Sequence, residues 1–584
     1  MKHINNKKLL VTTGLLETCG KDEEILFLGG WCKPYKNNDL IQVRKHMTIP
    51  YHWSDSNKRR HDYDYLSELF ERVLVGLVSS LNKFHNTDYS LRYWRIILGP
   101  WLFTYVSVLW DRWENIRVAF DKEEFDSTMV MILDAEKLVP INFDDWNRLV
   151  IDDLWNHHIF NGIIKFLYKE KVNIDYVPYT GSYQSKNNNI DKRSKIQKLI
   201  GVIDKLFGKI QKNYKVVFVH TYFKLPVLAK LSLRLRQFPR IHSSFSKSID
   251  VSDYLINRHF LFFKMESKNL FEKYLESNIV SQIPIAYVEG YSKYRNEIEK
   301  IDCDGEIIFT ANAHLRNDIF NAWCAKKVEE GKKLIISQHG GGIKSEMAMI
   351  RHQEKIADKM VVWHKPQENI HVQLSPNKLI NIQKKRSFRS DLTLVGYEPK
   401  IYTNRAQSGP IGDGVYDDYM QKIDFCNYLS TEVKKHIRVR SSSYGDGWFN
   451  SLNRYKDDLG EDKISSYKTL KKAIQHSRII VCTYPQTTFS EAMHSGVPTI
   501  LIIDKNLWQL DKNFDEVLNQ LKDIKIIFYD AKEAAEHVND IWSNPSLWWE
   551  KPETIQAREY FFDMCGRVSN DWLDEWSAFF KENI

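Results

Sequence analysis

Residues 478–503 read RIIVCTYPQTTFSEAMHSGVPTILII, and this stretch decides the fold. An apolar run ends at Cys482, a loop rich in Thr follows, and Gly496 and Pro498 then turn the chain into a second apolar run. We interpret the stretch as strand, loop, helix, turn and strand. That succession is the repeating unit of a parallel α/β sheet.

The same rhythm recurs elsewhere in the chain. Apolar runs that we expect to be strands lie at 23–32, 215–223, 305–314, 332–342, 356–364, 392–399, 435–448 and 524–530. Helical segments separate them, which predicts a mostly parallel, doubly wound sheet. The charged stretch NIQKKRSFRSD (381–391) precedes a fresh strand, and we place a hinge there. We therefore predict two facing Rossmann-like domains of the GT-B type, residues 1–385 with a helical N-terminal insertion and residues 386–584.

Composition and charge narrow the function classes. The chain has 584 residues, too many for one core of the usual roughly 100–200 residues. Its 83 Lys and Arg against 75 Asp and Glu give a formal charge of only +8, which argues against a nucleic-acid partner. The seven cysteines are scattered and form no C-x-x-C pair. A reducing compartment therefore fits better than a disulfide framework or a zinc site.

No segment is expected to cross a membrane. The N-terminal apolar patch is broken by Glu17 and Lys21, unlike a signal peptide. The longest uncharged apolar run, 96–110, is shorter than the roughly 20 residues that span a bilayer. We predict a cytoplasmic protein. The aromatic stretch 93–110 and the basic loop 185–197 are the two candidates for peripheral contact with the inner face of the cell membrane, with a buried helix and a solvated loop as the respective alternatives.

The loop and helix within 478–503 form the first candidate site. The N–H groups and the positive dipole end at the start of a helix favour a phosphate. Thr487, Thr488 and Ser490 add hydroxyl groups, and Glu491, one turn into the helix, could accept hydrogen bonds from a ribose. We interpret these four residues as nucleotide-binding. The alternative is an ordinary strand-to-helix connection capped by Thr.

The second candidate site, SQHGGGIKSE (337–346), follows an expected strand. Consecutive glycines let a ligand approach the backbone, and their amides can form an anion-binding nest. His339 could donate to a phosphate or shuttle a proton, because an imidazole titrates near neutral pH. Lys344 could neutralise a phosphate. A structural histidine and a solvated lysine are the alternatives. The predicted ligand loop comprises Gly340, Gly341, Gly342 and Lys344.

Three further charged residues are candidates. Glu289, ahead of the strand at 305–314, could act as a general base or nucleophile, with a surface or capping glutamate as the alternative. Arg438 and Arg440 alternate along an expected strand and so point to one face. Either could bind a phosphate or a sugar carboxylate. The alternative is an ion pair with Asp446 or Glu432.

No motif indicates a metal or a cofactor. The chain lacks G-x-x-x-x-G-K-[ST], G-x-G-x-x-G after the first strand, G-x-S-x-G and H-E-x-x-H. It also lacks the D-x-D, flanked by apolar residues, of metal-dependent glycosyltransferases. We therefore predict no cofactor and no metal, which favours a metal-independent transferase.

Several segments resemble a bacterial family of transferases from O-antigen and surface-polysaccharide gene clusters. The matching segments are LVTTGLLET with ILFLGGWC, YSLRYWRIILGPWL, IPIAYVEGY, the stretch from IIFTANAH to QHGGG, IADKMVVWH, IRVRSSSYGDGW, VCTYPQTTFSEAMHSGVPTI and IWSNPSLWWE, nearly the whole length. More distantly, the chain is similar to GT-B transferases that use CMP-Kdo or CMP-nonulosonate donors. It also resembles the CDP-glycerol polymerases, which have a W-H-G-T motif. The segment QHGGG of this chain matches that motif only at His-Gly.

The resemblance implies a metal-independent glycosyltransferase. The expected donor is a nucleotide-sugar, with Kdo or another CMP-activated 2-keto acid sugar favoured. The expected acceptor is a glycan or lipid-linked glycan of an O-antigen, lipopolysaccharide or surface polysaccharide. His339 or Glu289 would handle the acceptor proton, while residues 487–491 with Arg438 or Arg440 would stabilise the departing phosphate. A nucleotide-sugar epimerase-like enzyme, which needs no acceptor, and a non-catalytic scaffold of polysaccharide assembly, which binds no nucleotide, are the alternatives.

Overall fold

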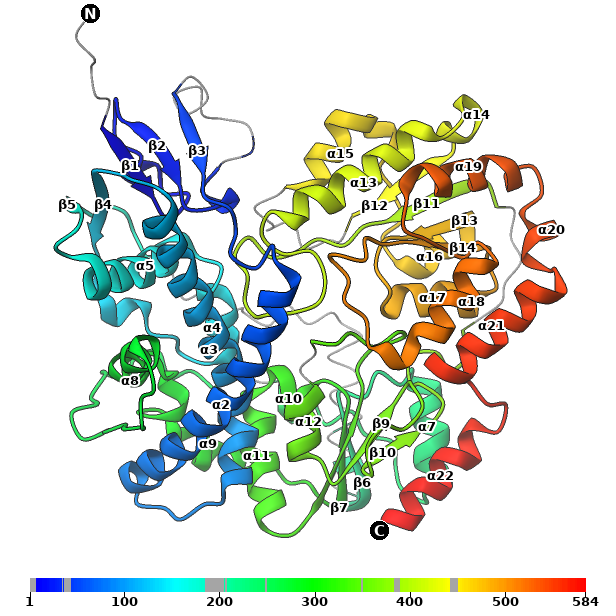
Figure 1. Cartoon of the computed structure of the whole chain (residues 1–584). Coiled ribbons are helices and arrows are strands. Elements are labelled where there is room, and N and C mark those ends of the chain that lie inside the picture. Colours follow the sequence, from blue (N-terminus) through cyan, green and yellow to red (C-terminus); the bar gives the residue numbers. More distant parts are fainter. Residues whose placement is uncertain are drawn as a thin grey trace, which may run out of the picture.

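The computed structural model describes residues 7–33, 35, 44–183, 204, 207–208, 210–246, 249–347, 350–382, 389–441 and 450–584. Within these residues the chain builds three five-stranded sheets, and neighbouring strands in all three run parallel (Figure 1). The predicted α/β class is confirmed. The basic loop 185–197 lies outside the described residues.

The first sheet belongs to the N-terminal region, drawn blue to cyan in Figure 1. Its order is β3-β2-β1-β4-β5, formed by β1 (Lys8–Val11), β2 (Glu24–Phe27), β3 (His46–Thr48), β4 (Ser127–Ile132) and β5 (Asn173–Pro178). Two long helices, α2 (Ser56–His85) and α3 (Leu91–Lys122), separate β3 from β4 in sequence. Of these five strands the sequence analysis expected only β2; it missed the central strand β1 as well as β3, β4 and β5.

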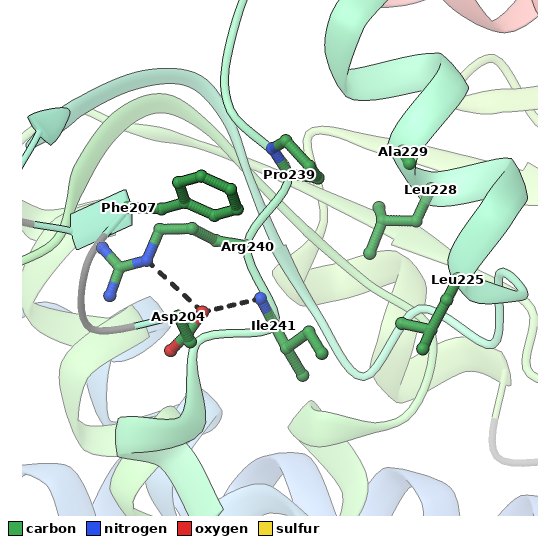
Figure 2. Close-up of a pocket in the computed structure, with 8 residues that line it drawn as sticks. All are labelled: Asp204, Phe207, Leu225, Leu228, Ala229, Pro239, Arg240 and Ile241. Carbon is green, nitrogen blue, oxygen red and sulfur yellow. Dashed lines mark hydrogen bonds and ion pairs between the residues drawn. The ribbon is translucent and has the colours of Figure 1, made fainter. Parts of the chain in front are cut away.

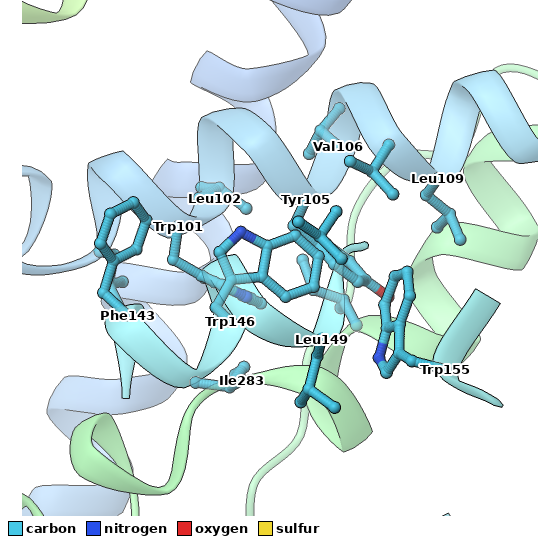
Figure 3. Close-up of a cluster of buried hydrophobic side chains, with 14 of the residues drawn as sticks. Trp101, Leu102, Tyr105, Val106, Leu109, Phe143, Trp146, Leu149, Trp155 and Ile283 are labelled. Carbon is cyan, nitrogen blue, oxygen red and sulfur yellow. The ribbon is translucent and has the colours of Figure 1, made fainter. Parts of the chain in front are cut away.

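The aromatic stretch 93–110 is the inner part of α3, and nearly all of it is buried. Trp101 and Tyr105 of α3 pack near Trp146 of α4 (Phe143–Leu149) and Trp155 of α5 (Asp153–Tyr168), as Figure 3 shows. The buried Trp146 indole donates to Thr104 Oγ1 at 2.8 Å, so its polar atom is satisfied. The stretch 93–110 is therefore core, as in the alternative of a buried helix. Among the described residues, no helix is both long enough and apolar enough to cross a bilayer.

The second sheet has the order β10-β9-β8-β7-β6. Its strands are β6 (Asn213–Val219), β7 (Asp304–Thr310), β8 (Lys333–Ser337), β9 (Lys359–Val362) and β10 (His371–Gln373). The C-terminal helix α22 (Trp572–Asn583) returns to this sheet and lies beside α7 (Leu225–Arg234) (Figure 1). Trp576 and Phe580 of α22 contact Phe309 of β7, which buries that face of the sheet.

The third sheet has the order β12-β11-β13-β14-β15. It comprises β11 (Asp391–Val395), β12 (Ile437–Arg440), β13 (Ser477–Cys482), β14 (Thr499–Ile502) and β15 (Ile527–Phe528). Between β13 and β14 runs α17 (Thr487–Ser495), which ends at Gly496 with φ 74°. A glycine in this left-handed conformation is the usual end of a helix. The strand, loop, helix, turn and strand predicted for 478–503 are thus confirmed.

The second and third sheets face each other at the carboxyl ends of their strands. The segment after β8 crosses to the third sheet, where Ser345 forms an antiparallel bridge with Leu510. Ser490 Oγ of α17 donates to the Gly341 carbonyl at 3.2 Å. The region before residue 385, described from the sequence as one domain with a helical insertion, holds two sheets. The predicted boundary itself falls at 383–388, outside the described residues.

Candidate functional site

Cations gather where the second and third sheets meet. In α/β proteins, ligands bind beyond the carboxyl ends of parallel strands. Arg316 ends the short helix α10 (Ala313–Arg316) that follows β7, and Lys378 follows β10. Lys400 and Arg405 belong to the loop after β11. We call these four residues the basic cluster.

His339, two residues after β8, lies within the basic cluster. Burial among the surrounding protein, together with Lys378, Arg405 and Arg316, lowers its pKa to about 4. The side chain nevertheless keeps a surface exposed to solvent, and it forms no hydrogen bond with any described residue. At neutral pH this imidazole is therefore uncharged, with its polar atoms available to an anionic ligand.

The carboxylates near the basic cluster form no ion pairs with its cations in the part of the chain that the structure describes. Burial, together with Arg316 and Arg405, lowers the pKa of Lys400 to about 8. Burial also lowers the pKa of Lys378 and of Arg405. In the described part of the chain, none of the four cations pairs with a carboxylate. Arg316 and Lys400 keep surface exposed to solvent, while Lys378 and Arg405 are half-buried. An anion could therefore reach the four cations, and their charges would stabilise it.

Glu491 of α17 faces the lysines of the second sheet. Burial raises its pKa, while Lys378 and Lys224, which precedes α7, lower it. Two hydroxyls of the predicted nucleotide site are already engaged: Thr488 shares a hydrogen bond with Tyr484, and Ser490 donates to the glycine loop. The structure thus brings Glu491 and His339 together with a common neighbour, Lys378.

The predicted ligand loop lies against α17. A Cβ added to Gly340 would lie 2.1 Å from Thr487 Oγ1, and one added to Gly342 would lie 2.6 Å from Ser490 Oγ. Gly342 also has φ 141°, which a residue with a side chain rarely adopts. The absence of side chains therefore serves the close approach of the third sheet to the second. The sequence had attributed the same glycines to the approach of a ligand.

Glu289 and Lys344 are held in ion pairs. The Glu289 carboxylate accepts from Arg258 Nε at 2.8 Å and from an Arg258 terminal nitrogen at 3.0 Å. Both side chains are less than a tenth exposed. The structure does not join Glu289 to the basic cluster, so its predicted role as a base or nucleophile has no geometric support. Lys344 Nζ lies 3.4 Å from Asp511, an ion pair across the two sheets.

Arg438 and Arg440 lie on β12, the edge strand of the third sheet. Arg440 donates to the Tyr467 carbonyl at 2.7 Å, and Arg438 donates to nearby backbone carbonyls. Among the described residues neither forms an ion pair, and Glu432, an expected partner, pairs with other residues instead. Asp446, the other expected partner, lies outside the described residues.

The basic cluster itself escaped the sequence analysis. Arg316 and Lys400 each follow an expected strand closely, so their positions at strand ends could have marked them as candidate site residues. Lys378 and Arg405 lie in long loops, several residues away from any expected strand, so nothing in the sequence marked them. Only folding brings Lys378, Arg405 and Arg316 to His339, and Lys400 to the two arginines.

A cavity of about 200 Å³ lies beside α7 (Figure 2). Leu225 and Leu228 of α7 form one wall, and Phe207 and Pro239 line it further. Its two polar lining residues form an ion pair, with Arg240 Nε 3.5 Å from Asp204 Oδ1. Asp204 balances the charge of Arg240, so this largely apolar lining has no net positive charge to offer a phosphate.

Comparisons with known proteins give a family and one solved structure. Residues 8–580 match the model of the LIC12162 family transferase. No curated protein matches the chain. A crystal structure of an S. aureus TarM mutant in complex with fondaparinux, alpha-GlcNAc-glycerol and UDP is similar at 10% sequence identity with a TM-score of 0.30. That match covers 47% of this chain and 55% of the TarM chain, so it spans about half of the TarM length.

Proposed function

This chain belongs to the LIC12162 family of transferases, and on that premise we propose that it is a GT-B glycosyltransferase acting on a nucleotide-sugar donor and a glycan acceptor. The observation that carries the proposal is the basic cluster. Three of its cations act on the His339 imidazole, and the fourth, Lys400, lies near Arg316 and Arg405. None of the four pairs with a carboxylate among the described residues. The phosphate of a nucleotide-sugar supplies the negative charge that such a site lacks.

The cluster supports a reaction that needs no metal ion. When a sugar leaves its nucleotide, the bond between the anomeric carbon and a phosphate oxygen breaks, and negative charge develops on the phosphate. Fixed cations stabilise that charge where it forms, which is commonly the largest catalytic contribution. Arg316, Lys400 and Arg405 would take this role. His339, neutral at pH 7, would donate one further hydrogen bond to the phosphate.

The nucleoside would lie along the start of α17. Thr487 is the first residue of this helix, and its hydroxyl has no hydrogen-bond partner in the described part of the chain. Glu491 lies one turn further on and would accept from the ribose hydroxyls. Thr488, Ser490, Arg438 and Arg440 remain proposed contributors, although their polar groups have partners within the protein.

The distribution of charge supports a donor with two separate anionic groups. Lys224 and Lys378 lie near Glu491, whereas Arg316, Lys400 and Arg405 influence one another. A CMP-activated 2-keto acid sugar such as CMP-Kdo carries one phosphate and one carboxylate, which could occupy the two parts. We propose such a donor and an O-antigen, lipopolysaccharide or other surface-polysaccharide acceptor, presented at the inner face of the membrane.

Product analysis on the full chain tests this function. The enzyme is incubated with CMP-Kdo, a UDP-sugar or a GDP-sugar, with and without a polysaccharide acceptor, in the presence of EDTA. We expect release of the nucleotide and a new glycosidic product that depends on the acceptor. Turnover of the donor without an acceptor would indicate the epimerase-like alternative. Failure to bind any nucleotide would indicate a scaffold, and loss of transfer in EDTA would contradict the metal-free reaction.

A further inference from the structure

A carboxylate of the N-terminal region stands beside the basic cluster. Asp144 is the second residue of α4, whose first backbone N–H, that of Phe143, donates to Asp318 Oδ2 at 2.9 Å. Asp318 opens α11 (Asp318–Glu329), two residues after Arg316. This hydrogen bond ties the start of α4 to the carboxyl end of β7. Asp144 is consequently close enough to Arg316 for the guanidinium to influence its ionisation.

The neighbouring residue Asp145 stabilises the start of α4 through its own hydrogen bonds and ion pair, whereas Asp144 takes no part in these contacts. Asp145 Oδ2 accepts the Ile141 backbone N–H at 2.9 Å, and Asp145 Oδ1 pairs with Arg148 at 2.8 Å. The helix is capped by Asn142, whose side chain accepts the Asp145 N–H. Asp144, by contrast, keeps a surface exposed to solvent although the protein partly encloses it, and it forms no hydrogen bond or ion pair with any described residue. Its carboxylate is free to meet a substrate.

The surroundings of Asp144 make it a stronger base than an ordinary aspartate. A carboxylate in the first turn of a helix is normally stabilised in its charged form. Here burial raises the pKa of Asp144, and Arg316 only partly opposes that effect. The other titratable groups that influence or are influenced by it are Asp318 of α11, Tyr294 of α9 (Tyr291–Ile298) and Tyr287 just before α9.

Asp318, which is partly buried, is not a free alternative. Burial raises its pKa to about 6, but its two oxygens accept from the Tyr287 hydroxyl and the Phe143 N–H. The pKa of His339 is shifted in the opposite direction, because burial and neighbouring cations lower it to about 4. Two groups whose pKa values are displaced in opposite directions commonly divide acid and base roles between them. His339 is then suited to hydrogen bonding, and Asp144 to accepting a proton.

We propose that Asp144 is the general base of the transfer reaction and removes the proton of the acceptor hydroxyl. This inference rests on the glycosyltransferase function proposed above. The hydroxyl oxygen forms a bond to the anomeric carbon of the donor while the bond from that carbon to the donor phosphate oxygen breaks. The bonding electrons pass to the phosphate beside the basic cluster. The hydroxyl proton passes to a carboxylate oxygen of Asp144, so atoms and charge balance.

The test compares Asp144→Asn with Asp145→Asn in the full chain. Asparagine keeps the size of the side chain but cannot accept the proton. We expect Asp144→Asn to lower kcat at least about a hundredfold, the usual contribution of a general base, and to leave the melting temperature and the nucleotide Kd within twofold. Asp145→Asn, the control, should lower the melting temperature and spare the specific activity of the folded fraction. Asp144→Glu should restore part of kcat.

The outcomes separate this inference from the function on which it rests. If the wild type transfers sugar and Asp144→Asn retains kcat within a few-fold, Asp144 is not the base, whereas the proposed function stands. If Asp144→Asn fails to fold, the side chain is structural and the inference is overturned. If the wild type transfers no sugar from any donor, the proposed function itself fails. The acidic limb of the pH profile of kcat/KM should be present in the wild type and absent from Asp144→Asn; an unchanged limb also contradicts the inference.

Discussion

One added methyl group, in Gly340→Ala, tests how the second and third sheets meet. The new Cβ would lie 2.1 Å from Thr487 Oγ1, whereas Cβ atoms essentially never approach other atoms within 3.0 Å. The Thr487 hydroxyl must therefore retreat by roughly 0.9 Å, or the two sheets must separate. The φ of Gly340 lies outside the left-handed region, so alanine brings no backbone strain. The whole cost then comes from the contact, and overpacking of this kind costs about 1–3 kcal/mol.

The contact is isolated by a double-mutant cycle with Thr487→Ala. Removing the hydroxyl leaves Thr487 Cβ as the nearest remaining atom, at 3.4 Å from the added methyl group, which is an ordinary contact. We expect urea unfolding, monitored by tryptophan fluorescence, to show a lower free energy of unfolding in Gly340→Ala than in the wild type. Adding Thr487→Ala should restore about 1 kcal/mol or more of that free energy. Additive effects of the two substitutions, or an unchanged unfolding midpoint in Gly340→Ala, would refute the packing described here.

Three other predictions follow from buried or perturbed groups. Glu289→Ala should lower stability by about 3–5 kcal/mol, because it leaves Arg258 buried without its partner; the folded fraction should keep its specific activity, and a selective loss of kcat would restore a catalytic role. Burial lowers the pKa of His157 to about 3, and its Nε2 accepts the Met131 N–H, so the folded protein keeps it neutral. Stability should fall by about 1.4 kcal/mol per unit as the pH drops from about 6.5 towards 3, and chemical denaturation should show that this contribution is missing from His157→Gln. Lys400, with a pKa of about 8, should acylate faster at neutral pH than surface lysines and be protected by nucleotide, as mass spectrometry would measure.

The sheets could be predicted wherever long apolar runs form the strands. The stretch 478–503 contains its own turns, and β13, α17 and β14 appear where it places them. β1, β3, β4 and β5 were not expected, and the pairing of β1 with β2 and β4 becomes visible only after folding. The third sheet was therefore readable from local pattern, and the first sheet was not.

The candidate site was less predictable, because its residues meet through long-range contacts. A run of glycines predicts that another group lies close to the backbone, but it does not say whether that group is a ligand or another part of the protein. Here the group is α17. The partner of Glu289, Arg258, lies 31 residues earlier in an irregular segment without a repeating pattern. His339 was singled out correctly as a strand-end residue of the junction. The cations around it come from separate loops.

The central claim is that the basic cluster binds the phosphate of the donor. Isothermal titration of the wild type and of Lys400→Ala with cytidine and with CMP, or with the nucleoside and nucleotide that the product analysis identifies, tests it most directly. The account predicts that the wild type binds the nucleotide much more tightly than the nucleoside. It also predicts that Lys400→Ala loses about tenfold or more of the nucleotide affinity and none of the nucleoside affinity, because a charge-assisted hydrogen bond contributes about 1.5–3 kcal/mol. Equal losses for both ligands, or no loss for either, would contradict it.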